Sequence, residues 1–284
     1  MKKDWVVDVV ARLPQGVVSR GWGWLARQRA PRPGIALAKR VFVRATGVDL
    51  DEAAEPIEAY DCLESLFVRR LKAGARPIDR DPHSVVSPVD ARVGACGTVE
   101  QGTLLQAKGR AYSLARLLDD EAMAARFEGG SYMTLYLSPR DYHRIHAPVA
   151  GAVAEAVLVP GSLMPVFDEA VAKVDELFAR NERLTTYVDH ADAGRVAVVK
   201  VGATLVGRIT AAYDPDLATN QVGQLRRRIS YSPARHLEKG GELGAFELGS
   251  TVVLVTEPRR VVLDTLAPGS SVRVGQRIGT ITPG

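Results

Sequence analysis

The 284-residue chain is poor in cysteine and has no long apolar run. Its two cysteines, Cys62 and Cys96, stand far apart without metal-ligand spacing, so we expect neither a disulfide framework nor a zinc site. No run of about 18 apolar residues occurs, which argues against a membrane-spanning helix, and the N-terminus lacks the apolar core of an export signal. These absences predict a protein of a reducing cytoplasm and leave peripheral membrane contact open.

Nucleotide-binding motifs are also missing. The sequence contains no Gly-x-Gly-x-x-Gly, no Walker lysine and no paired metal carboxylates, which argues against nucleotide and hydride chemistry. The composition is 46% hydrophobic and 25% charged, which is typical of a globular protein rather than a disordered one. We therefore expect one large domain with an appendage.

The net charge of +4 hides a strong asymmetry along the chain. Residues 1–44 carry ten lysines or arginines against two aspartates, and they also contain all three tryptophans, Trp5, Trp22 and Trp24. Apolar residues around Trp5 have helical spacing up to Pro14, a weaker stripe follows at Val18, Trp22 and Leu25, and residues 35–44 form a further amphipathic stretch.

Amphipathic helices that carry tryptophan and basic residues lie in the headgroup region of anionic membranes. We therefore predict that residues 1–48 attach the protein peripherally to the cytoplasmic face of the cell membrane. The alternative is a set of ordinary helices packed on the protein's own domain. Nucleic acid is not an expected partner, because polar and aromatic groups do not interleave as a groove-reading surface requires.

From about residue 84 onward the sequence consists of short β-rich runs separated by Gly, Pro and Asp. One clear helical pattern, residues 114–127, interrupts them. Strands that do not alternate regularly with helices predict an antiparallel α+β fold. We expect residues 49–284 to form a β-rich catalytic domain with a few helices, preceded by the amphipathic helical segment 1–48.

The bond between Gly249 and Ser250 is the predicted place for chemistry of the protein on its own chain. A serine hydroxyl can attack the preceding carbonyl and convert the amide to an ester, and glycine leaves that carbonyl unhindered. β-Elimination of the ester then splits the chain, and the resulting dehydroalanine hydrolyses to a pyruvoyl group. Gly-Ser is also a common turn dipeptide, so this motif alone leaves both interpretations open.

A serine nucleophile needs a base and a group that orients the base. His143 and His146 stand in a polar segment, residues 137–148, that is bracketed by prolines, as in a rigid loop at a strand end. The pair also has the spacing of a zinc half-site, but no third ligand is near, so no metal is expected. Asp90, which follows Ser87-Pro88-Val89, is the best candidate to orient the base; its alternative is a surface turn.

Several longer strings of the sequence, in this order, resemble those of the bacterial, membrane-associated phosphatidylserine decarboxylases. They are residues 76–79, 88–90, 106–109, 112–114, 136–146, 178–183, 201–204, 239–240 and 248–251. The resemblance covers nearly the whole chain and is loosest in the first 45 residues, where only the amphipathic, tryptophan-bearing character matches.

The resemblance implies roles for the candidate residues. Asp90 would orient His146, which would take the proton from Ser250 and start cleavage after Gly249. The products, residues 1–249 and 250–284, would remain together as a heterodimer, and a further homo-oligomer is left open. The pyruvoyl group at position 250 would be the cofactor: it would form a Schiff base with phosphatidylserine, and loss of CO₂ would yield phosphatidylethanolamine. His143 would deliver a proton or contact the phosphate.

Three other functions compete with this interpretation. A serine hydrolase acting on lipid esters through Ser250, His146 and Asp90 would keep its chain intact, but Ser250 lacks the second glycine of a Gly-x-Ser-x-Gly elbow. A pyruvoyl decarboxylase of a soluble amino acid leaves the basic N-terminal segment unexplained. A membrane-bound scaffold leaves the histidine-bearing loop unexplained.

Overall fold

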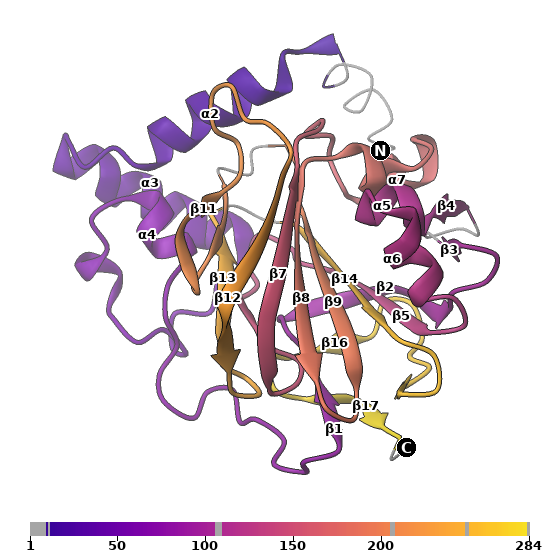
Figure 1. The fold of residues 1–284 in the computed structure, drawn as a ribbon. Helices are drawn as coiled ribbons and strands as arrows, with labels where there is room; N and C mark the ends of the chain where they lie inside the picture. Colours follow the sequence, from indigo (N-terminus) through magenta and orange to yellow (C-terminus); the bar gives the residue numbers. More distant parts are fainter. Residues whose placement is uncertain (1–9, 11, 106–109, 205–207, 248–249, 283–284) are drawn as a thin grey trace.

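The structure is a computed structural model that describes residues 10, 12–105, 110–204, 208–247 and 250–282. An eight-stranded sheet, antiparallel throughout, forms its centre (Figure 1). From edge to edge its strands are β12 (Arg227–Leu237), β7 (Gly151–Val159), β8 (Arg183–His190), β9 (Gly194–Val201), β14 (Thr251–Thr256), β5 (Ser131–Tyr136), β2 (Ala91–Thr98) and β16 (Ser271–Val272).

Three smaller antiparallel sheets complete the described β-structure. The first has the order β11 (Asp214–Ala218), β10 (Ile209–Ala211), β13 (Glu242–Phe246) and β6 (Arg144–His146). The second has the order β1 (Ser84–Val86), β17 (Arg277–Ile281) and β15 (Val261–Leu263), and the third pairs β3 (Thr103–Leu105) with β4 (Ala111–Ser113). This arrangement confirms the predicted antiparallel α+β class.

The described helices fall into two groups on either side of the central sheet in Figure 1. The N-terminal group is α2 (Gln15–Ala26), α3 (Arg32–Thr46), the 3₁₀-helix η1 (Ile57–Ala59) and α4 (Leu63–Phe67). The other group is α5 (Leu114–Leu118), α6 (Glu121–Arg126), α7 (Asp168–Lys173) and α8 (Leu177–Arg180).

The prediction of one continuous helix over residues 114–127 was wrong, because the segment forms two short helices, α5 and α6. Asp119 has a left-handed backbone (φ 57°) that ends α5, and the side chain of Asp120 accepts a hydrogen bond from the Met123 amide and begins α6. Aspartate favours such caps because its short carboxylate binds nearby backbone amides.

Strand β14, which follows Ser250, lies in the middle of the molecule. Val252 and Leu254 point into one core, between the central sheet and the two smaller sheets, whereas Val253 and Val255 point into the other, against α5–α8. A strand buried on both faces is continuously apolar rather than alternating, as Val252–Val255 is. The position of Ser250 is therefore set by packing on both sides of the sheet.

The N-terminal segment is helical where it is described. Trp24 and Leu37 are exposed by 64% and 63%, whereas Trp22, which belongs to the predicted stripe of Val18, Trp22 and Leu25, lines the cavity that contains Ser250. The predicted helix around Trp5 lies outside the described residues. Within the part of the chain that the structure describes, no helix combines the length and apolar character of a bilayer crossing. Helix α3 ends at Thr46, and Gly47 follows with φ 75°, which glycine adopts without strain.

Candidate active site

Ser250 is fully buried at the start of the central strand. Its carbonyl accepts a hydrogen bond from the Leu137 amide at 2.8 Å, which fixes the backbone next to the loop that follows β5. Its hydroxyl Oγ has no hydrogen-bond partner among the described residues. A buried hydroxyl without a partner is costly in a folded protein, so such a group needs a functional or structural explanation. Gly249, the other half of the predicted cleavage site, lies outside the described residues.

Ser250 lines a cavity of about 250 Å³ with a mainly apolar wall. Its other lining residues are Trp22, Phe42, Phe67, Tyr136, Leu137, Pro139, Pro165, Val166, Phe167, Ala203 and Thr204. Trp22 and Phe42 belong to α2 and α3, so the N-terminal helices form part of this wall. The sequence assigned these helices to the membrane and did not indicate that they also border the serine.

His143 is completely buried beside this cavity. Its ring packs on Phe67, a cavity residue, with the two ring centroids 4.0 Å apart. Nδ1 lies 2.8 Å from the carbonyl oxygen of Asp141, and since a carbonyl only accepts, Nδ1 carries the proton. Nε2 therefore has a free lone pair, and it has no partner among the described residues. Burial lowers the pKa of His143 to about 3, so this imidazole is neutral at physiological pH.

His146 uses both ring nitrogens for internal contacts. Nδ1 donates to the Gly240 carbonyl at 2.7 Å, and Nε2 lies 3.2 Å from the hydroxyl of Tyr142, which donates to it. Burial lowers the pKa of His146, while its bond to Gly240 and the charges of Glu242 and Asp90 raise it. His146 and Asp90 are thus electrostatically coupled, but no hydrogen bond joins their described side chains.

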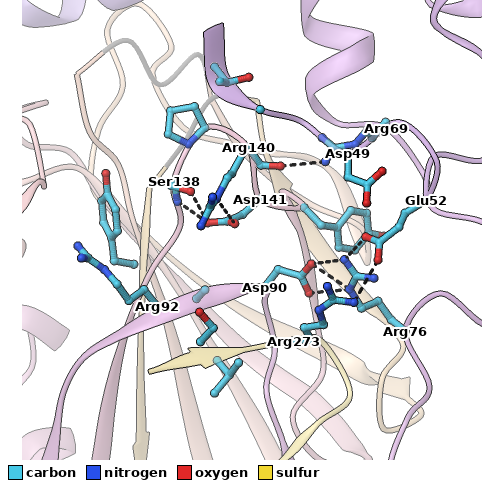
Figure 2. A pocket seen from close by; sticks show the side chains of 18 of the residues that line it. Asp49, Glu52, Arg69, Arg76, Asp90, Arg92, Ser138, Arg140, Asp141 and Arg273 are labelled. Carbon is cyan, nitrogen blue, oxygen red and sulfur yellow. Dashed lines mark hydrogen bonds and ion pairs between the residues drawn. The ribbon is translucent and has the colours of Figure 1, made fainter. Parts of the chain in front are cut away.

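Asp90 is instead held by Arg76. Nε of Arg76 lies 2.9 Å from each carboxylate oxygen, and the Val274 amide donates to Oδ1 at 2.8 Å. Glu52 accepts from the same guanidinium at 2.6 Å, so Arg76 bridges two carboxylates. Figure 2 shows this clamp at the edge of a polar cavity of about 770 Å³. Asp90 is therefore a buried site residue, not a residue of a surface turn.

The polar cavity adjoins the apolar one, because Tyr136 and Pro139 line both. Between them, Asp141 accepts hydrogen bonds from the amide and the hydroxyl of Ser138, each at 2.7 Å (Figure 2). Burial raises the pKa of Asp141. The loop of residues 137–143 therefore separates a charged compartment that contains Asp90 from an apolar one that contains Ser250.

A partly buried charge cluster lies just before the predicted cleavage site. Glu247 accepts from Arg27 of the N-terminal segment at 3.2 Å and from Arg208 at 2.9 Å. Glu64 of α4 lies against this cluster, 3.7 Å from Arg27. Burial and the neighbouring carboxylate of Glu247 raise the pKa of Glu64 to about 7. The cluster ties α2 and α4 to the segment that leads to Ser250.

The sequence named the four candidate catalytic residues, but it did not predict the residues that contact and position them. Arg76 stood in a string that carried the family resemblance, and a buried aspartate requires a cation, so a partner for Asp90 could have been sought there. Phe67 and the pair Glu64 and Glu247 had no sequence signal, since their roles depend on contacts between distant segments. The roles predicted for Asp90, His143, His146 and Ser250 stay predictions.

Comparisons with known proteins identify the family of the chain. The family model described as phosphatidylserine decarboxylase matches residues 63–280. The chain is 49% identical to a phosphatidylserine decarboxylase proenzyme of Anaeromyxobacter sp. (strain K), over 96% of this chain and 97% of that protein. It is 47% identical to the proenzyme of Myxococcus xanthus (strain DK1622), over 95% and 96%, and 40% identical to that of Brevibacillus brevis (strain 47), over 99% of each. The serine hydrolase alternative is not supported. The chain belongs to the phosphatidylserine decarboxylase family.

Proposed function

We propose that this chain is a proenzyme that cleaves its own Gly249-Ser250 bond and then decarboxylates phosphatidylserine to phosphatidylethanolamine. One observation supports this most directly: the Ser250 hydroxyl is buried and has no partner among the described residues, and Ser250 lines an apolar cavity. The names of the relatives, which are proenzymes, agree with a precursor that is converted to the active form.

Self-cleavage proceeds in steps that need only this chain and water. Oγ of Ser250 bonds to the carbonyl carbon of Gly249, the C–N bond breaks, and the released nitrogen takes up a proton. Removal of the Ser250 Cα proton then breaks the Cβ–Oγ bond, which leaves a carboxylate on Gly249 and dehydroalanine at position 250. Water adds, ammonia departs, and residues 250–284 begin with a pyruvoyl group.

The surroundings of Ser250 fit such a group. Its apolar wall excludes water, which strengthens electrostatic interactions within the site. The pyruvoyl group supplies an electrophilic ketone that condenses with the substrate amine and accepts the electron pair released with CO₂. Trp22 and Phe42 of α2 and α3 line the same cavity, so the segment that we assign to the membrane borders the place where the substrate would react.

We assign different proton transfers to His143 and His146. We assign His146 to the proton of Ser250 during self-cleavage: burial lowers the pKa of this ring, which keeps it a neutral base, and the charges of Glu242 and Asp90 partly offset that effect. We assign His143 to the substrate reaction, either as the proton donor to carbon or as a contact to phosphate, because its ring packs against the cavity wall. In either role Nε2, which carries a lone pair in the neutral ring, must first take up a proton.

We further propose that residues 1–48 hold the enzyme on the cytoplasmic face of the cell membrane. Helices α2 and α3 expose Trp24, Leu25, Leu37 and Val41 in a strongly basic segment. An enzyme that stays at the surface leaves the acyl chains in the bilayer, and extraction would cost about 0.8 kcal/mol per exposed CH₂.

Denaturing mass spectrometry of purified protein tests the proposal. We expect chains of residues 1–249 and 250–284, the smaller one without a free α-amino group and reducible by borohydride. Ser250→Ala should stay whole, while Ser271→Ala, an exposed serine of the same fragment, should cleave. An intact wild-type chain in fresh and aged samples would contradict self-cleavage. Release of CO₂ from phosphatidylserine vesicles measures the decarboxylation, and release of fatty acid would instead indicate a hydrolase.

A further inference from the structure

The segment between β11 and β12 presents two unusually exposed aliphatic side chains. Val222 and Leu225 are 86% and 76% exposed, more than any other large hydrophobic residue that the structure describes. Water-exposed apolar side chains cost free energy roughly in proportion to their area, so a prominent pair of them marks an interaction site more often than chance.

Polar contacts within and below the segment hold it in shape. The Gln221 amide donates to Oε1 of Gln224 at 2.9 Å, and Nε2 of Gln224 donates to the Ala218 carbonyl at 3.1 Å. The Asn220 amide donates to Glu182 at 2.9 Å, which anchors the base of the turn on the main body. The polar groups of the turn therefore form hydrogen bonds within the protein, whereas its two aliphatic side chains are exposed to solvent.

This turn lies beside the N-terminal helix that we assign to the membrane. Nη1 of Arg20, in α2, donates to the side-chain oxygen of Asn220 at 3.5 Å. Figure 1 shows the orange segment above β11 and β12 next to α2. Helix α2 itself exposes Val17 and Trp24, by 59% and 64%. Two parts of the chain, some 200 residues apart in sequence, thus present apolar side chains from adjoining elements.

The charges that follow the turn suit an anionic surface. Arg226 and Arg228 form ion pairs with Asp119 and Asp120, on one side of the strand. Arg227 lies between them, is exposed, and has no ion-pair partner in the described part of the chain. Successive side chains of a strand point to opposite sides, so Arg227 points away from those acids. Val222 and Leu225 could therefore enter the acyl-chain region of an anionic leaflet while Arg227 contacts its negatively charged headgroups.

We propose that residues 220–227 form a second membrane-inserting element, which docks on an anionic lipid bilayer beside α2. This inference rests on the proposed membrane association of residues 1–48. A bilayer fits better than a second copy of the chain, since two side chains on a narrow turn are far too small for a stable protein interface, which buries on the order of 1,200 Å² or more. Membrane contacts through both α2 and this turn would fix the orientation of the Ser250 cavity relative to the lipid.

Flotation with vesicles of phosphatidylglycerol and phosphatidylcholine tests the inference without substrate turnover. The double variant Val222→Ser/Leu225→Ser should bind at least about tenfold more weakly than the wild type, because it loses two inserted aliphatic side chains. Val222→Trp should bind at least as tightly as the wild type. The matched control is Val262→Ser, an aliphatic residue of β15 that is 60% exposed, and its binding should not change.

A third variant separates this inference from the proposed role of α2. If Trp24→Ser/Leu25→Ser loses binding while Val222→Ser/Leu225→Ser keeps it, the turn has no membrane role and the proposed function stands. If the wild type itself fails to float with anionic vesicles, the proposed membrane association fails as well. Unchanged vesicle binding together with an altered oligomeric state of the turn variant, measured by light scattering, would assign the surface to a second copy and overturn the inference. Activity on detergent-dispersed phosphatidylserine should be retained by the turn variants, which shows that they fold.

Discussion

Arg76 binds the carboxylate of Asp90 through three hydrogen bonds: Nε donates to both oxygens at 2.9 Å, and Nη2 donates to Oδ2 at 2.5 Å. Both side chains are at most 10% exposed. Arg76 therefore fixes the position from which the Asp90 charge raises the pKa of His146 against the larger effect of burial.

Removal of Arg76 should slow self-cleavage and destabilise the fold. Arg76→Met leaves the carboxylates of Asp90 and Glu52 without their shared cation, and breaking a buried pair typically costs about 3–5 kcal/mol. Urea unfolding in the uncleavable Ser250→Ala background measures the loss, and a time course of cleavage measures the rate. Arg76→Lys keeps the charge but not the fork of donors, so it should lie in between.

The matched control for Arg76 is Arg92→Gln. Arg92 pairs with Asp168 at 3.1 Å, but both side chains are about half exposed, and such pairs contribute about 1 kcal/mol or less. Equal losses in the Arg76 and Arg92 variants would show that Asp90 does not depend on its buried clamp.

The neutral state of His143 predicts a loss of stability in acid. Burial depresses its pKa to about 3, below the usual value of 6.5, so between these values the unfolded chain binds more protons than the folded one. Stability should therefore fall as pH falls from 6.5, by about 1–2 kcal/mol down to pH 5. His143→Asn should flatten this dependence in urea titrations of the Ser250→Ala protein. The exposed His236→Gln should leave it unchanged; a slope that survives in His143→Asn would assign the effect to other groups.

The sequence predicted the antiparallel α+β class because residues such as Val252–Val255 combine high β-propensity with turn residues at both ends. It also named Ser250, His143, His146 and Asp90, since a nucleophile, bases and an acid are recognisable residue types. The sequence did not predict which of these side chains contact one another. The sequence paired the Asp90 carboxylate with His146, and only tertiary packing shows that Arg76 binds it.

The same limit applies to the N-terminal helices. An amphipathic stripe states that one face is apolar, but it does not state what covers that face. Trp22 and Trp24 stand two residues apart, and one lines the Ser250 cavity while the other is 64% exposed. Packing on the domain and exposure to solvent are thus divided between neighbouring residues of one helix.

Glu64 predicts a pH dependence of the opposite sign at higher pH. Its pKa is raised to about 7 by burial and by the adjacent Glu247, against a usual 4.5, so the folded chain binds the extra proton between these values. Stability should decrease as pH rises from 4.5 to 7 and stay reduced above it. Glu64→Gln removes this penalty and should stabilise the Ser250→Ala protein by about 1 kcal/mol or more at pH 8, since each pKa unit corresponds to about 1.4 kcal/mol. Asp61→Asn, an exposed acid near Arg29, is the control and should have little effect.

The two cleavage products should stay together without a covalent bond. Residues 250–284 enter the molecule through β14, which pairs with β9 over Thr251–Thr256 and with β5 over Thr251–Val255. The same fragment contributes β15 and β17 to a second sheet, where β17 also pairs with β1 of the larger chain. Extraction would expose Val252, Val253, Leu254 and Val255, each fully buried, at about 1.5–3 kcal/mol per side chain.

Native mass spectrometry of the matured protein should therefore show one particle with the mass of both chains, and denaturing conditions should separate them. Val253→Asp, which places a charge in the core on the α5–α8 face, should weaken the association after cleavage. Val262→Asp, on the exposed side of β15, should not. Spontaneous release of the small chain from wild-type protein in native buffer would show that β14 does not hold it, and that the interior position of this strand is lost once the Gly249-Ser250 bond is cut.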